Sequence, residues 1–370
     1  MKRLIIILVA FVALACEREI TPQSQDETIM FSVSATGLEV TRSEVTDAGL
    51  AEGVDGGTMG LRLHETLLSD YIYGLRLAPE KNNGTFTGRW FPDAAHGGQR
   101  PKWTDKATNA NIIPAMSFFA FAFSPFSKYG SSIVVGEGSR GRSVTITQPS
   151  SYQGAGFIDY LLSYEVDVPA QKVGDSHPLI ALQLEHALTK VELYVDCAEA
   201  FKDSKYKIEF TELCFNDIYT TATLTVSHHK KAGEVGSNLW AVSYASGDGT
   251  VNDYNLVADP SAPVVLNVGN EGPVMEFIAF PVSSTFPYTL NVAYKVYENS
   301  STEQTPQWTE IASSTTTFTL RNFTPKGWLS GHKVRYSLHI DNGIELTGKI
   351  TDWVEGDYIE GVIFPDQNVQ

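Results

Sequence analysis

Apolar and polar residues alternate with a period of two along most of this chain, and this pattern constrains the fold more than any other feature. In residues 29–35, Ile29, Phe31, Val33 and Ala35 share one face of an extended strand, and serines lie on the other. Comparable short runs recur with Gly- and Pro-containing turns between them, and an aromatic content of 11% suits strands. No stretch shows a long, capped 3.6-residue period. The sequence therefore predicts an all-β protein.

The length of the chain predicts two domains. At 370 residues it exceeds the size at which a single core keeps growing. Apolar rhythm is lost in the polar stretch 228–236, which marks a boundary. We expect a β-sandwich domain in residues 29–227, with a long exposed loop at 36–60, and a second β-sandwich domain in residues 228–370.

Individual strands follow from the same alternation. The segment 198–205 is the one place where a helical turn or two is expected. We expect strands at residues 29–35, 61–67, 71–77, 85–90, 116–123, 143–147, 160–166, 179–184, 186–194, 207–215, 222–226, 240–244, 264–268, 275–282, 288–297, 316–320, 333–340, 344–350 and 359–364.

The N-terminus has the layout of a bacterial lipoprotein signal. Lys2 and Arg3 precede an apolar run at 4–15, which ends at Cys16 and is too short to span a bilayer as a helix. We predict that residues 1–16 form a signal peptide ending at a lipidated Cys16, and that the polar segment 17–28 is a flexible leash. Ordinary secretion is the alternative, because Ala13 and Leu14 depart from the usual pattern before the cysteine.

Charge and side-chain chemistry exclude several classes of function. A net charge of −16 without a basic stripe disfavours a nucleic-acid partner. No nucleophile with a nearby base is found, and the carboxylates at 352, 355 and 357 fit a solvated turn better than a calcium site. We therefore expect no enzyme activity, no metal and no cofactor, and we predict that Cys197 and Cys214 are free, buried thiols.

Several motifs together resemble one known family. They are Cys16 followed by a polar leash, the strand at 29–35, the tripeptide Thr41-Arg42-Ser43, the segment 186–191 (His-Ala-Leu-Thr-Lys-Val) and the segment 328–336, which begins Trp-Leu-Ser-Gly. In this combination the chain resembles the precursors of the fimbrillin family, the type V pilus subunits of anaerobic diderm bacteria. The likeness spans nearly the whole chain.

The resemblance implies a fold and a mode of assembly. Its members consist of two transthyretin-like β-sandwich domains, are exported to the outer membrane as lipoproteins and are cut after an arginine by a trypsin-like or arginine-specific protease. Arg42 is the matching residue, so cleavage would remove the lipid anchor together with Ile29, Phe31, Val33 and Ala35. The neighbouring subunit would then insert a C-terminal donor strand from residues 357–370, with Ile359, Val362, Ile363 and Phe364 as its apolar residues. The implied role is adhesion by a head-to-tail fimbrium on the cell surface, with a host or bacterial surface as ligand.

Alternatives to this interpretation stay open at the level of the sequence. Arg42 can be an ordinary loop residue, and the strand at 359–364 can be the last strand of its own domain. A different class of function is a monomeric surface lipoprotein that binds glycans. In that case exposed aromatic rings would stack on sugars, and the candidates are Trp90, Trp103, Tyr152, Trp240 and Trp308.

Overall fold

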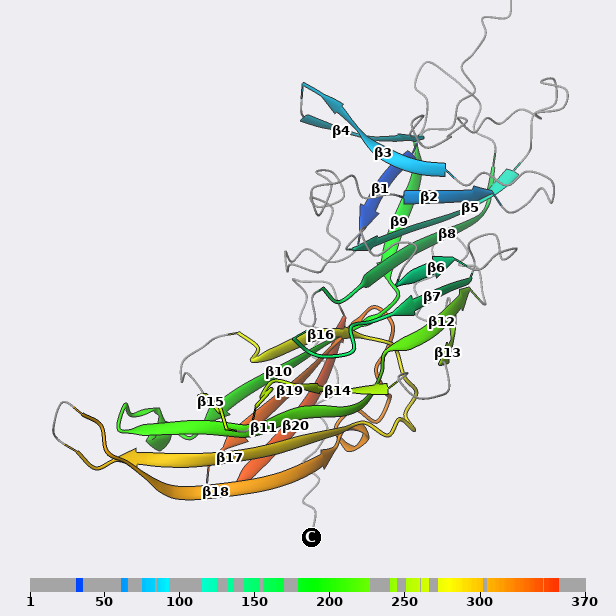
Figure 1. The fold of residues 1–370 in the computed structure, drawn as a ribbon. Coiled ribbons are helices and arrows are strands. Elements are labelled where there is room, and N and C mark those ends of the chain that lie inside the picture. Colours follow the sequence, from blue (N-terminus) through cyan, green and yellow to red (C-terminus); the bar gives the residue numbers. More distant parts are fainter. Residues whose placement is uncertain are drawn as a thin grey trace, which may run out of the picture.

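The protein is built almost entirely from β-strands, as the sequence predicts (Figure 1). Twenty strands and two short 3-10 helices, Glu199–Lys202 and Leu320–Asn322, lie in the described part of the chain. The computed structural model describes residues 31–35, 61–65, 75–83, 85–92, 115–124, 132–135, 143–153, 156–169, 179–226, 240–244, 251–259, 261–265, 272–301, 305–341 and 343–352.

Seven strands form the first sheet. Their pairing runs β1-β4-β3-β2-β5-β8-β9 and returns from β9 to β1, where the two strands are parallel. A two-residue turn joins β3 to β4, and its first residue, Asn83, has a φ of 50°, as the tight hairpin turn of an Asn-Gly pair requires. The strands are β1 Phe31–Ala35, β2 Leu61–Glu65, β3 Leu75–Asn82, β4 Thr85–Pro92, β5 Ala115–Ser124, β8 Asp159–Pro169 and β9 Ile180–His186.

A smaller sheet lies next to the first one. Its order is β13-β12-β7-β6, so it combines strands that are far apart in the sequence. The hydroxyl oxygens of Thr145 and Thr223 lie 2.8 Å apart across β7 and β12. The strands are β6 Ile133–Val135, β7 Ser143–Thr147, β12 Thr221–Val226 and β13 Trp240–Tyr244.

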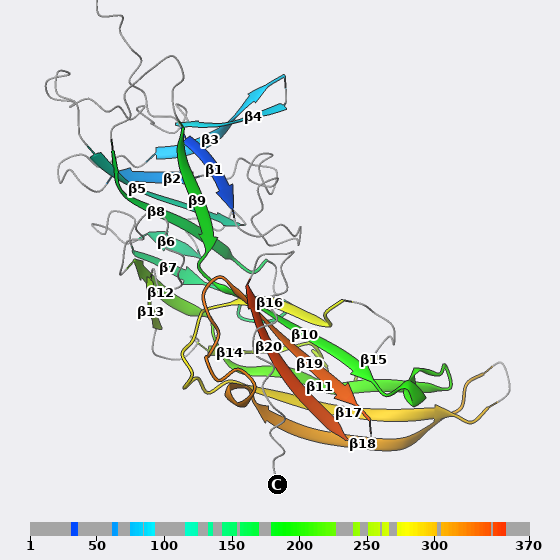
Figure 2. The ribbon, with the colours of Figure 1, turned by 180° about the vertical axis from the view of Figure 1, so that it is seen from behind.

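The remaining strands form a β-sandwich, seen in the lower half of Figure 1 and from behind in Figure 2. One layer, the β10 sheet, has the order β16-β10-β19-β20; the other, the β17 sheet, has the order β14-β11-β17-β18, with β15 also paired to β11. The strands are β10 Thr189–Cys197, β11 Tyr206–Tyr219, β14 Val251–Asn255, β15 Val264–Val265, β16 Met275–Ala279, β17 Thr289–Asn299, β18 Trp308–Thr319, β19 His332–Ile340 and β20 Ile344–Asp352.

Alternating side chains of the two layers fill the sandwich core. Alternate residues from 290 to 296 on β17 and from 334 to 340 on β19 point into it and are at most 4% exposed, which is the pattern that period-two alternation predicts. These core residues are Leu290, Val292, Tyr294 and Val296 on β17, and Val334, Tyr336, Leu338 and Ile340 on β19.

Among the chain passages between the first two sheets and the sandwich, two are very short and fully described. Ala187 and Leu188, both fully buried, join β9 to β10, and Thr220 joins β11 to β12. The predicted division between residues 29–227 and 228–370 therefore does not follow sheet membership, since β10 and β11 pair with strands that come after residue 264. The number of independently folding domains and their boundary stay predictions.

The two cysteines of the sandwich are free and buried, as predicted. Cys197 lies on β10 and Cys214 on β11, and these two strands lie in opposite layers of the sandwich. Burial raises the pKa of the Cys214 thiol to about 12, and burial also raises the pKa of Cys197. Both thiols are therefore poor nucleophiles at neutral pH.

Candidate strand-exchange site

Strand β1 lies between two strands that come much later in the sequence. It pairs in parallel with β9 over its whole length, from Phe31 opposite Ile180 to Ala35 opposite Leu184. On its other side a single residue pair, Phe31 opposite Trp90, links it to β4. One long ladder and one short contact hold β1 in the sheet.

The register of β1 places its apolar residues opposite buried residues of β9. In the parallel register Phe31, Val33 and Ala35 lie opposite Ile180, Leu182 and Leu184, and these three residues of β9 are between 0% and 4% exposed. Phe31 itself is fully buried. Burying a phenylalanine side chain contributes about 1.5–3 kcal/mol, so Phe31 anchors β1 to the sheet.

Departure of β1 would open an apolar groove with an unpaired strand edge. The groove would be lined by Ile180, Leu182 and Leu184, with Trp90, which is 1% exposed, at the Phe31 end. The N–H and C=O groups of β9 that now pair with β1 would need a new partner strand. Sequence reasoning identified residues 179–184 as a strand but missed them as the lining, because no local pattern reveals a pairing with residues 31–35.

Most of the predicted site residues lie outside the described residues. Within β1 the structure pairs Phe31, Val33 and Ala35 with Ile180, Leu182 and Leu184 of β9, and the displacement of β1 stays a prediction. The residues predicted for lipidation (Cys16), cleavage (Arg42), the start of the first strand (Ile29) and the donor strand (Ile359, Val362, Ile363 and Phe364) lie outside the described residues, and their roles stay predictions.

The two inner segments that carry the family resemblance contact each other where β9 joins β10. The amide of Gly331 donates to the carbonyl of Leu188 at 2.9 Å, and the Thr189 hydroxyl donates to the carbonyl of Leu329 at 2.7 Å. Gly331 has a φ of +69°, and a Cβ there would lie 3.2 Å from the His186 carbonyl oxygen, so glycine suits this position. The two motifs therefore stabilise the fold at this junction by contacting each other.

Two further residues of these segments are buried in polar pairs. The ring nitrogen Nδ1 of His186 lies 3.0 Å from the Asp159 carboxylate, with both side chains at most 2% exposed. The indole nitrogen of Trp328 donates to the Tyr336 hydroxyl at 2.9 Å. Burial raises the pKa of that phenol well above its usual value, so it stays protonated. These pairs satisfy polar atoms inside the core.

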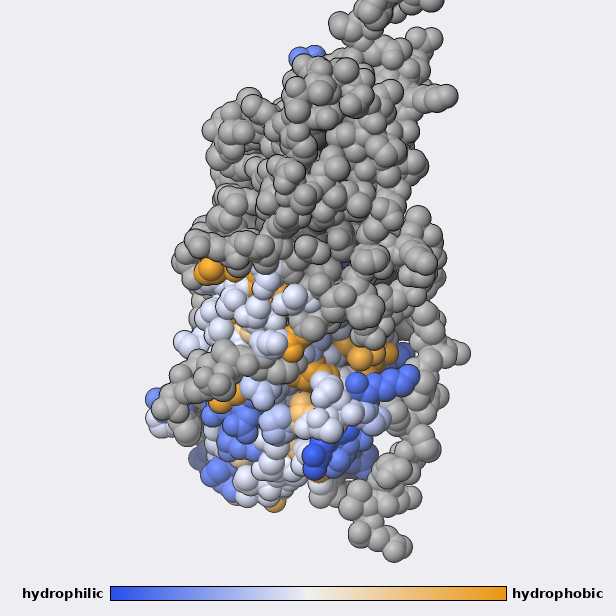
Figure 3. All heavy atoms as spheres, turned by 90° about the vertical axis from the view of Figure 1, so that its right-hand side faces the viewer, coloured by the Kyte–Doolittle hydropathy of each residue, from blue (hydrophilic) through white to orange (hydrophobic). Residues whose placement is uncertain are grey.

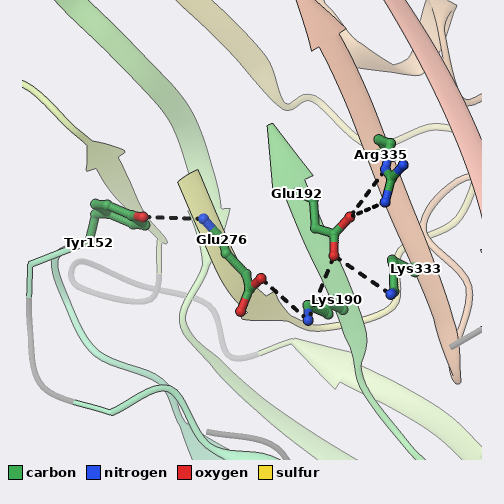
Figure 4. A network of polar contacts seen from close by, with 6 residues as sticks. All are labelled: Tyr152, Lys190, Glu192, Glu276, Lys333 and Arg335. Atoms are coloured by element: carbon green, nitrogen blue, oxygen red, sulfur yellow. Dashed lines mark hydrogen bonds and ion pairs between the residues drawn. The ribbon is translucent and has the colours of Figure 1, made fainter. Parts of the chain in front are cut away.

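A network of charges covers the outer face of the β10 sheet (Figure 4). Glu192 is its centre: its carboxylate lies 3.6 Å from Lys190 Nζ, 3.7 Å from Lys333 Nζ and 3.2 Å from Arg335 Nη2. Lys190 also reaches Glu276 at 3.3 Å. The side chains of Lys190 and Glu192 are only 2% and 4% exposed. Each of these buried charges therefore needs its oppositely charged partner, because a buried charge without one is strongly destabilising.

The strand register explains why two ion pairs of this network, Glu192 with Lys333 and Lys190 with Glu276, run diagonally. Lys190 lies directly opposite Lys333, and Glu192 lies directly opposite both Arg335 and Glu276. The like charges that face each other are each compensated by a neighbour two residues along a strand. The network therefore ties β16, β10 and β19 together. One pattern in the sequence could have indicated this network: charged residues occupy alternate positions at 190 and 192 and again at 333 and 335.

Three of the aromatic residues considered for glycan stacking have described side chains, namely Trp90, Tyr152 and Trp308. Trp90 is buried, so its expected exposure was wrong. The hydroxyl of Tyr152 accepts a hydrogen bond from the amide of Glu276 at 3.2 Å, and Lys207 Nζ lies 4.9 Å from the ring centre of Trp308. Trp103 and the side chain of Trp240 lie outside the described residues.

The described residues contain no group of three or more His, Cys, Asp or Glu side chains placed to hold a metal ion. None of their helices combines the length and the apolar character that crossing a membrane requires.

Fold and site together define an all-β, sandwich-containing protein in which an N-terminal strand completes a sheet. The family model described as Fimbrillin-like matches residues 82–353, and the chain belongs to this family. The family gives the chain a role as a fimbrial, cell-surface protein that associates with other fimbrial subunits, and not as an enzyme.

A solved structure with a TM-score above 0.5 agrees with this fold. A fimbrial protein from Bacteroides vulgatus ATCC 8482 is similar with a TM-score of 0.55 at 13% identity, covering 88% of this chain and 99% of that chain. A fimbrial assembly protein from Parabacteroides distasonis ATCC 8503 has a TM-score of 0.37 at 12% identity, covering 88% of this chain and 98% of that chain. No curated protein matches the chain.

Proposed function

We propose that the chain is the precursor of a fimbrial subunit that polymerises by donor-strand exchange and serves adhesion. The observation that carries the proposal is the position of β1: an apolar strand from the N-terminal end of the chain fills a place in the first sheet against β9. A segment that precedes a cleavable loop and completes a sheet can be removed without breaking the rest of the chain.

Export and anchoring come first in the proposed sequence of events. Cys16 receives the lipid and holds the precursor at the outer membrane through the leash 17–28. In this state β1 protects the groove, so subunits do not polymerise before they reach the surface. Protection matters because an open strand edge with an apolar groove binds any available strand.

Cleavage after Arg42 then releases both the anchor and β1. The strand is held by one parallel ladder and by the burial of Phe31, and it is no longer covalently attached after the cut. Parallel ladders are slightly less stable per residue than antiparallel ones. An incoming strand that pairs antiparallel with β9 would therefore bind more strongly than β1 does.

The donor is proposed to be residues 357–370 of the neighbouring subunit. Ile359, Val362, Ile363 and Phe364 provide the apolar side chains that the groove of Ile180, Leu182, Leu184 and Trp90 requires. The exchange is head-to-tail, so it generates an open filament and not a closed dimer. The filament would carry the adhesive contact with a host or bacterial surface.

Protease treatment of the purified precursor tests this function. We expect an arginine-specific protease to release a leader that ends at Arg42 and to yield ladders on a denaturing gel run without boiling, because an inserted donor strand is buried and slow to leave. Mass spectrometry of the leader identifies the cut.

Two matched variants serve as controls. Arg42→Gln should stay uncut at that site and monomeric, and a chain shortened after residue 356 should be cut but form no ladder. A protein that is cut after Arg42 and remains monomeric contradicts strand exchange. Ladders from Arg42→Gln contradict the assignment of the cleavage site.

A further inference from the structure

Strand β18 forms a long open edge of the sandwich. It is 12 residues long, and within the described part of the chain it pairs with β17 alone. Residues 309–313, 315 and 317 are exposed. Figures 1 and 2 both place β18 at the outer margin of the molecule, away from β1. This edge is separate from the proposed exchange groove.

The other edges of the sandwich are better protected against pairing with another chain. Strands β14 and β16 have only 5 residues each. Strand β20 carries Glu345, Lys349 and Asp352 along its length. Short length and charged side chains are the devices by which proteins block edge-to-edge association.

Strand β18 has few such devices. It contains neither lysine nor proline, and Glu310 is its only charged residue. A β-bulge at Ile311, which is 46% exposed, disturbs the ladder only near the N-terminal end. The segment that follows, residues 312–319, consists of Ala, Ser, Thr and Phe in regular pairing with β17. Backbone N–H and C=O groups on its outer side can therefore accept another strand.

We propose that β18 pairs antiparallel with β18 of a second copy of this chain, related to the first by a two-fold axis perpendicular to the sheet. Antiparallel pairing brings Glu310 of one copy toward the end of the other strand, where the exposed Arg321 follows β18. Parallel pairing would instead bring Glu310 next to its own copy.

Side-chain chemistry along the edge favours the same partner. Cross-strand Thr–Thr and Thr–Ser pairs are stabilising in antiparallel sheets, and the self-paired segment places no like charges opposite one another. On the face shown in Figure 3, hydrophobic residues reach the surface in separate spots among hydrophilic ones.

The pairing gives the fimbrial protein a lateral contact. A single strand pair is a weak interface, but a filament would repeat it at every subunit, and repeated contacts combine into a high avidity. Neighbouring filaments would associate side by side through β18. This contact does not depend on the proposed donor-strand exchange, since it uses a different edge.

Sedimentation of the uncut full chain tests the proposal, because the precursor cannot undergo strand exchange. The protein carries Cys16→Ser so that no lipid contributes. We expect a concentration-dependent dimer, and we expect Thr315→Lys to weaken it about tenfold or more, because like charges then face each other across the two-fold axis.

Thr225→Lys is the matched control, since it adds the same charge at an exposed residue of the central strand β12 and should leave the dimer unchanged. As a second measurement, Thr315→Cys should give a disulfide-linked dimer on mild oxidation and Thr225→Cys should not. A chain that is monomeric at every concentration overturns the proposal, as does equal weakening by both lysine variants or equal cross-linking of both cysteine variants.

Discussion

Glu192→Ala is expected to lower the free energy of unfolding by about 3–5 kcal/mol, the usual cost of removing one partner from a buried ion pair. The Glu192 carboxylate is the common partner of Lys190, Lys333 and Arg335, at 3.6, 3.7 and 3.2 Å. Without it, the side chains of Lys190 and Lys333, which are 2% and 10% exposed, face each other across β10 and β19 with less negative charge nearby. Repulsion between the two lysine ammonium groups and the burial of their uncompensated charges then both lower the free energy of unfolding.

Urea unfolding followed by tryptophan fluorescence measures this effect. Trp328 lies in the sandwich core and reports directly on the loss of packing there. Glu345→Ala is the matched control, because Glu345 is exposed on β20, and its loss should change the free energy by no more than about 0.5 kcal/mol. A Glu192→Ala protein as stable as the control would show that the network does not hold β16, β10 and β19 together.

The sequence predicts the strands of this protein well where apolar residues alternate. Strands β7 and β13 have the predicted bounds, and the described part of the predicted strand 29–35, residues 31–35, is strand β1. The same rule misses β14 altogether and recovers only the end of β18, at residues 316–319. Both are edge strands with mostly polar or small residues, and they are held by pairing with β11 and β17. A strand that buries little of its own surface leaves little apolar signal in the sequence.

Pairing between distant segments could not be predicted from the residues. Nothing in residues 29–35 indicates β9 as the neighbour, and nothing near residue 227 indicates that β10 and β11 pair with later strands. Likewise, alternating charges on β10 and β19 are typical of a solvated face, whereas Glu192 is buried. The predicted exposure of Trp90 failed for the same reason, since its environment comes from β1.

Locking β1 onto β9 with a disulfide is expected to abolish polymerisation completely. Ser32 and Ala181 are direct partners in the parallel register, and both side chains lie on the face opposite Phe31. Adjacent strands are about 4.8 Å apart, which suits a disulfide between Ser32→Cys and Ala181→Cys. Cys16→Ser removes the predicted lipid site, and the native thiols at 197 and 214 are buried and unreactive. The bond should therefore form where it is intended.

Gel analysis of this locked precursor, cut after Arg42 with and without a reducing agent, is the most direct test of whether β1 must leave its place against β9. The oxidised protein should be cut yet remain monomeric, and reduction should restore the ladder given by the wild type. Ser32→Cys alone should polymerise under both conditions. A ladder from the oxidised double variant would contradict strand displacement, because β1 would still occupy the groove while the subunits assembled.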